Sequence, residues 1–177
     1  RVWNAQDGTE LLVLSGHTSS VQDAAWSPAD DRIVTASQDR TAEIWDAKTA
    51  QEVITLTGHA NTVTALSWSP DGKNIATASV DGTCRVWDAA SGRVLFVLTG
   101  HTAGLLDIAW SSDGRLLATS SLDGTSQIWD AATGVSLSVL RGLALSRAEL
   151  AWSPSYQHLA IMGGILPRVW DLSEKSL

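Results

Sequence analysis

Residues 58–98 read GHANTVTALSWSPDGKNIATASVDGTCRVWDAASGRVLFVL, and this stretch decides the fold. Its first part, residues 62–68, alternates apolar and polar side chains and ends at Ser69-Pro70-Asp71-Gly72, where Pro fixes φ and Gly adopts positive φ. Asp81-Gly82 is typical of a tight hairpin turn. Further short β-prone runs occupy residues 74–79, 83–88 and 93–98. The stretch therefore predicts an antiparallel meander of four short strands.

The nine tryptophans repeat this unit along the chain. One ladder, with spacings of 42, 42, 42 and 41 residues, consists of Trp3, Trp45, Trp87, Trp129 and Trp170. A second ladder, with 42 residues at every step, consists of Trp26, Trp68, Trp110 and Trp152. Two interleaved ladders of one period indicate a copied supersecondary unit. Because such a meander cannot bury both faces alone, the copies must stack, and we expect both ladders to pack between them.

Two dipeptides recur in one phase with the tryptophans. Gly-His occurs at 16–17, 58–59 and 100–101, and Trp-Asp occurs at 45–46, 87–88, 129–130 and 170–171. These marks resemble those of the WD-repeat (WD40) family over the whole chain. The resemblance implies an all-β fold of four-stranded antiparallel propeller blades, about four per chain, forming half of a seven- or eight-bladed ring. It divides the chain into a strand stub and closing strand at 1–15 and repeats at 16–57, 58–99, 100–141 and 142–177.

Composition excludes several classes of partner. The net charge of −7, from 12 Lys+Arg and 19 Asp+Glu, makes nucleic acid an unsuitable ligand. The single cysteine, Cys84, leaves no intrachain disulfide and suits a reducing compartment, so we expect a cytoplasmic protein. No apolar run approaches the roughly 20 residues that span a bilayer, and no targeting signal is visible. We therefore expect neither a nucleic acid nor a membrane as partner.

A His, a Thr, an Asp and a Trp recur at fixed intervals of 18, 4 and 6 residues. The three sets are His17, Thr35, Asp39 and Trp45; His59, Thr77, Asp81 and Trp87; and His101, Thr119, Asp123 and Trp129. A hydroxyl, an imidazole and a carboxylate suggest a nucleophilic relay, but they also suit a structural hydrogen-bond network. Catalysis needs one set of these residues beside one substrate, whereas a structural hydrogen-bond network is needed in every blade. We therefore predict three structural tetrads, as the resemblance also implies, and no metal ligand among these histidines.

The resemblance implies that the loops entering the first strand and the turns between the second and third strands share one rim, where partners bind. The candidate positions on that rim are Ser19, Gln38, Asn61, Val80, Ala103 and Leu122. Val80 and Leu122 are apolar in turns where water exposure needs no apolar side chain. They predict either a small apolar patch for a partner or scattered surface residues without a role.

Two functions follow from these patterns. The first is a non-catalytic protein–protein interaction scaffold without a cofactor, for example the sensor part of a larger protein. The second is a propeller hydrolase or lyase with a site in the central channel, which would need convergent carboxylates in the first strands. Only Asp23 and Asp107 recur there, and Ala65 takes the corresponding place in the second repeat. The scaffold is therefore the favoured hypothesis.

The fourth repeat departs from the pattern. Leu143 replaces the His, Ile161 stands at the Thr position, and residues 162–167 replace the Asp-Gly turn, with Pro167 at the start of the third strand. We expect this blade to be softer than the others and to lack a tetrad.

Counting blades leaves three arrangements open. Four blades of the WD type are too narrow to close a ring, and residues 1–4 duplicate a third strand. The chain is then a fragment of a longer protein, one half of a homodimeric eight-bladed ring in which residues 10–14 are exchanged, or a four-bladed monomer.

Overall fold

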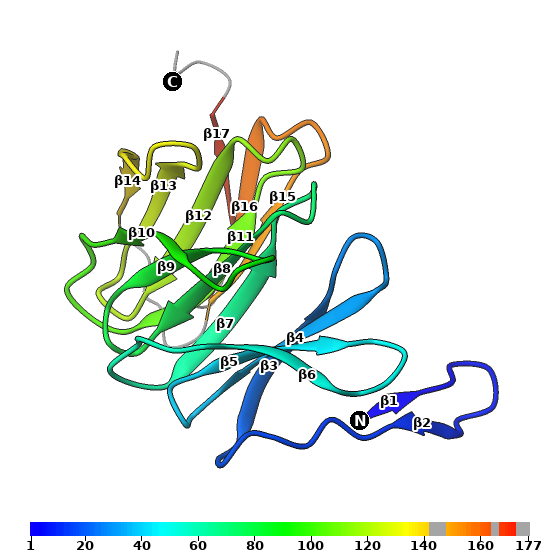
Figure 1. The fold of residues 1–177 in the computed structure, drawn as a ribbon. Coiled ribbons are helices and arrows are strands. Elements are labelled where there is room, and N and C mark those ends of the chain that lie inside the picture. The colour runs from blue at the N-terminus through cyan, green and yellow to red at the C-terminus, as the bar shows by residue number, and fades with distance from the viewer. Residues whose placement is uncertain (142–147, 164–166, 173–177) are drawn as a thin grey trace.

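The computed structural model describes residues 1–141, 148–163 and 167–172, and within them the chain forms seventeen strands and no helix (Figure 1). Three four-stranded antiparallel sheets follow one another in sequence, and we call them blades 1, 2 and 3. A three-stranded sheet, blade 4, follows them, and a separate two-stranded hairpin precedes them. The all-β fold of antiparallel blades that the sequence predicted is therefore confirmed.

In blade 2 the strands lie within about a residue of the predicted runs, whereas β2 (Glu10–Leu12) ends two residues before the predicted closing strand 10–14 does. The hairpin contains β1 (Val2–Trp3) and β2 (Glu10–Leu12). Blade 1 contains β3 (Val21–Trp26), β4 (Arg32–Ser37), β5 (Ala42–Asp46) and β6 (Glu52–Leu56). Blade 2 contains β7 (Val63–Trp68), β8 (Asn74–Ser79), β9 (Cys84–Asp88) and β10 (Val94–Leu98). Blade 3 contains β11 (Leu105–Trp110), β12 (Leu116–Ser121), β13 (Ser126–Asp130) and β14 (Ser136–Leu140). Blade 4 contains β15 (Glu149–Trp152), β16 (His158–Met162) and β17 (Arg168–Asp171).

The blades stand side by side, with the hairpin beyond blade 1 at one end and β17 at the other (Figure 1). Their first strands are neighbours, because β3 contacts β7, β7 contacts β11, and β11 contacts β15. Apolar clusters fill the spaces between blades. The cluster between blades 1 and 2 joins Ile44 and Leu56 to Val63, Leu66 and Trp68. The core is thus made of inter-blade layers, as stacked meanders require.

One face of blade 1 has no such layer. Val21 is 52% exposed, whereas the equivalent Val63 and Leu105 are 0% and 1% exposed. In the same way Trp26 is 47% exposed, whereas Trp68 is 8% exposed. Trp3 in the hairpin is exposed as well. The prediction that every tryptophan packs in the core is therefore wrong for Trp3 and Trp26, because among the described residues no sheet covers their face.

The turns of blade 1 also differ from those of its neighbours. Gly72, Gly82 and Gly92 in blade 2 adopt positive φ, and so do Gly114, Gly124 and Gly134 in blade 3. At the same three places blade 1 carries Asp30, Arg40 and Ala50, with φ of 55°, 75° and 60°. Non-glycine residues cost energy in this left-handed region. Blade 1 therefore holds the same backbone path as its neighbours at a higher conformational cost.

The irregular features of the fourth repeat fall partly outside the described residues. Leu143 and residues 164–166 of the altered turn lie outside them. Ile161 is buried in β16, and Pro167 stands immediately before β17, where a strand tolerates the loss of an N–H donor.

Candidate functional site

In each of blades 1 to 3 the four recurring residues form one chain of hydrogen bonds. In blade 2 the indole Nε1–H of Trp87 donates to Thr77 Oγ1 over 2.8 Å. The same Oγ1 lies 2.8 Å from His59 Nε2, and His59 Nδ1 lies 2.9 Å from Asp81 Oδ2. The corresponding distances are 2.8, 2.7 and 2.8 Å in blade 1 and 2.9 Å throughout in blade 3. The chain runs from the second and third strands to the loop that enters the blade.

The aspartate ties this chain to the backbone. Asp81 Oδ2 also accepts the N–H of Ala60, and Oδ1 accepts the N–H and hydroxyl of Thr83. Although burial opposes it, these bonds and the bond to His59 lower the pKa of Asp81 to about 2. Burial in turn lowers the pKa of His59, which is therefore neutral at neutral pH. Each aspartate locks an entry loop to the turn between the second and third strands.

The tetrads have no geometry for nucleophilic catalysis. Thr77 and Thr119 are fully buried, and Thr35 is 6% exposed. Each hydroxyl already bonds both an indole and an imidazole, so no substrate carbonyl reaches it. Each tetrad can instead hold two loops of its blade in place, and this arrangement occurs in blades 1, 2 and 3.

The loops held by the tetrads form one rim, which we call the tetrad rim and define by Ser19, Gln38, Asn61, Val80, Ala103 and Leu122. Backbone bonds join its two kinds of loop, because the N–H groups of Gln38, Val80 and Leu122 donate to Ser20, Thr62 and Gly104. Buried serines add a second connection, in which Ser79 Oγ donates to Asn61 O and Ser121 Oγ donates to Ala103 O. Val80 is 41% exposed and Leu122 is 52% exposed, whereas Ala103 is half-buried. The rim is therefore a rigid surface with two apolar residues facing solvent.

Asp23 and Asp107, the carboxylates that suggested an enzyme, are occupied by backbone amides. Asp107 Oδ1 accepts the N–H of Ile108 in its own blade, and Oδ2 accepts the N–H of Leu150 in blade 4 over 2.6 Å. Asp23 does the same, with Ala24 in its own blade and Leu66 in blade 2. These bonds connect neighbouring blades, so neither carboxylate is directed at a substrate.

This arrangement explains why Ala65 interrupts the aspartates. One carboxylate has two oxygens and supplies two blades, so an aspartate in every other blade satisfies all four amides. The indoles alternate in the same way. Trp68 and Trp152 donate across their junctions to carbonyl oxygens of Ala25 and Ala109, whereas the buried Nε1 of Trp110 has no partner among the described residues. Junctions 1–2 and 3–4 are therefore alike, and junction 2–3 is different.

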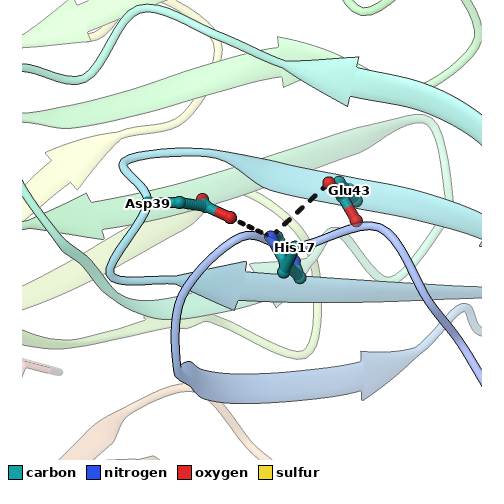
Figure 2. Close-up of side chains that lie close together, drawn as sticks. All are labelled: His17, Asp39 and Glu43. Atoms are coloured by element: carbon teal, nitrogen blue, oxygen red, sulfur yellow. Dashed lines mark hydrogen bonds and ion pairs between the residues drawn. The ribbon is translucent and has the colours of Figure 1, made fainter.

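Glu43 is a residue that the spacing of the tetrads did not reveal. It lies on β5 beside the first tetrad, with Oε1 3.5 Å from His17 Nδ1 (Figure 2). His17, Asp39 and Glu43 each bring one ligand atom within 4.8 Å of the others. The repeat itself carried the signal, because the same register holds Arg85 in blade 2 and Gln127 in blade 3. Blade 1 alone among these three places a second carboxylate beside its tetrad.

Comparison with known proteins agrees with this architecture. Three stretches of the chain, residues 8–46, 50–88 and 92–130, match the family described as WD domain, G-beta repeat. The chain belongs to the WD-repeat family. No curated protein matches the sequence. The three matched stretches contain the three tetrads. They contain neither residues 1–7 of the hairpin nor blade 4, so the fourth WD repeat remains a prediction from the tryptophan ladders.

Two general statements hold for the WD-repeat family. WD repeats typically mediate protein–protein interaction, and the family is generally non-catalytic. Among the described residues, no helix is long and apolar enough to cross a membrane.

Proposed function

We propose that this chain is a non-catalytic scaffold for protein–protein interaction and that it binds a protein or peptide on the tetrad rim. The observation that carries the proposal is the exposure of Val80 and Leu122 on turns whose backbone is fixed. Apolar side chains on a rigid surface bind with little loss of conformational entropy, which favours their use as contact points. The net charge of −7 and the lone buried Cys84 support a cytoplasmic protein that binds neither nucleic acid nor membrane.

The test is to select binders from a phage-displayed library of short random peptides and to measure their affinity for variants. Val80→Asp combined with Leu122→Asp should weaken the selected peptides at least about tenfold, a change of roughly 1.4 kcal/mol. The matched control is Val53→Asp combined with Val139→Asp, which changes two similarly exposed valines on the outer strands β6 and β14. Failure to select any peptide, or equal affinity for both double variants, would contradict a binding site on the rim.

We also propose that two copies of the chain complete each other as an eight-bladed ring. Two observations favour this assembly. Blade 1 leaves Val21 and Trp26 exposed on a face that is covered in blades 2 and 3, and blade 4 has three described strands where the others have four. Among the described strands, β2 pairs only with β1 and could serve as the fourth strand of a partner's blade 4. Light scattering should give twice the chain mass of 18.8 kDa, and the single mass would exclude the dimer.

A further inference from the structure

We propose that His17, Asp39 and Glu43 form a binding site for a divalent transition-metal ion of the zinc type, present beside the first tetrad and absent from the second and third (Figure 2). The site is independent of partner binding on the tetrad rim. It offers one imidazole nitrogen and two carboxylate oxygens, a donor set that suits Zn²⁺ better than Mg²⁺ or Ca²⁺.

The distances from His17 Nδ1 to the two carboxylates are close to those between ligand atoms in a zinc site. His17 Nδ1 lies 2.8 Å from Asp39 Oδ2 and 3.5 Å from Glu43 Oε1. Zinc bonds of about 2.0–2.2 Å in a tetrahedron place neighbouring ligand atoms about 3.3–3.5 Å apart. Of these two contacts, the one between His17 and Asp39 must lengthen by about half an ångström. The ligand oxygens of Asp39 and Glu43, which lie within 4.8 Å of each other, must take the same spacing. Three protein ligands leave the fourth position for water.

The charge of the cluster calls for a cation. The Glu43 residue is only 5% exposed, and its buried Oε2 has no hydrogen-bond partner among the described residues. The ion-pair partner that the described residues give Glu43 is His17 Nδ1, whose single proton is already shared with Asp39 at shorter distance. Burial raises the pKa of Glu43. A buried carboxylate without a full partner is costly, and a divalent ion would compensate both carboxylates at once.

The other tetrads serve as internal controls within the same chain. Arg85 on β9 and Gln127 on β13 occupy the register of Glu43. A guanidinium repels a metal ion, and an amide adds no charge. A structural need of the tetrad does not explain Glu43 either, because the tetrads of blades 2 and 3 have the same hydrogen bonds without a carboxylate there.

Metal binding is compatible with the hydrogen bonds of the tetrad. The ion would take the place of the proton on His17 Nδ1, and that proton would move through solvent to Nε2, so that the ring stays neutral. Nε2 would then carry the ring proton and donate it to Thr35 Oγ1, 2.7 Å away. That oxygen has two lone pairs, so it can accept from both His17 and Trp45. An open groove of about 650 Å³ between the hairpin and blade 1 is lined by Gly16 and His17, next to the proposed site.

The test is a calorimetric titration of the whole chain with ZnCl₂ at neutral pH, with MgCl₂ as the comparison ion. Wild type should bind one equivalent of Zn²⁺ and no Mg²⁺. Glu43→Gln should weaken zinc binding by at least about 10–100-fold, the loss typical of removing even an outer partner of a metal ligand. Because Gln127 fills the same register in blade 3, this variant is expected to fold, and circular dichroism checks that it does.

A second variant tests the idea by gain of a site. Arg85→Glu reproduces the cluster beside His59 and Asp81 and should raise the stoichiometry to two equivalents of Zn²⁺. The absence of saturable one-to-one binding by folded wild type would overturn the proposal. Equal zinc affinity of wild type and folded Glu43→Gln would overturn it as well, since the ion would then bind elsewhere.

Discussion

Replacing Asp107 by Asn should remove a pH-dependent part of the stability of the junction between blades 3 and 4. The Asp107 side chain is half-buried, and its carboxyl group accepts the amides of Ile108 and Leu150. Burial raises its pKa from 3.8 to about 6, against the lowering effect of these two bonds. The folded state therefore binds this proton more tightly than the unfolded chain does.

The sign and the size follow from linkage. A native pKa above the unfolded value contributes stability that is complete below about pH 4 and is lost as the pH rises through about 6. An interval of about two pH units corresponds to about 3 kcal/mol. The side-chain amide of the Asp107→Asn variant cannot titrate, so the wild-type stability minus the variant stability should fall by about this amount between pH 4 and pH 7.5. The carboxylates of Asp81 and Asp123 do not interfere at pH 4, because their pKa values lie at about 2. The tetrad histidines are the same in both proteins, so their titration cancels in the difference.

The assay is urea unfolding followed by tryptophan fluorescence at several pH values, for wild type, Asp107→Asn and the control Asp30→Asn. Asp30 is exposed in a turn at φ 55°, a conformation that Asn tolerates. The control should track wild type at every pH. A wild-type minus Asp107→Asn difference that stays constant, or that grows as the pH rises, would refute the reasoning, since the amide bonds would then outweigh burial.

Three further predictions concern stability and can be measured by urea unfolding at neutral pH. Thr77→Val keeps the shape of a fully buried side chain but removes the hydroxyl that bonds an indole and an imidazole, so it should lower the free energy of unfolding by about 2–4 kcal/mol. A loss below about 0.5 kcal/mol would show that the hydrogen bonds of the tetrad are not stabilising. Arg40→Gly should stabilise the chain by about 1 kcal/mol, because Arg40 holds φ 75° where blade 2 uses Gly82; no gain would mean that the arginine side chain compensates for its backbone cost. Trp68→Ala should lower the free energy of unfolding by about 3–5 kcal/mol, and Trp26→Ala by well under half of that in the monomer, because the two side chains are 8% and 47% exposed. Equal losses in a monomeric sample would contradict the open face of blade 1.

The repetition in the sequence made most of the fold predictable. Turn dipeptides such as Asp81-Gly82 and the alternating run 62–68 set the strand limits to within about a residue. Equal spacing of His59, Thr77, Asp81 and Trp87 with their copies linked residues that are up to 28 positions apart in the chain. Local rules were sufficient here because each blade is local in sequence.

What remained unpredictable depends on contacts between blades. The sequence pattern treated Trp26 and Trp68 as equivalent, and only the missing neighbour of blade 1 separates them. Asp23 suggested chemistry, and its role became clear only when its second oxygen was found on Leu66 of the next blade. Glu43 looked like one more polar strand residue until it was placed beside His17. In each case the decisive partner lies far away in sequence or is not found among the described residues.

The alternation of Asp23, Ala65 and Asp107 has a consequence for how such a chain can grow. Excising blade 2 alone would bring an Asp-bearing blade directly after another, so that two carboxylates compete for the amide of Ile108. Excising or inserting blades in twos would keep every amide served by one carboxylate. The modular unit for recombination in this protein is therefore a pair of blades, although each of blades 1 to 3 carries a tetrad of its own.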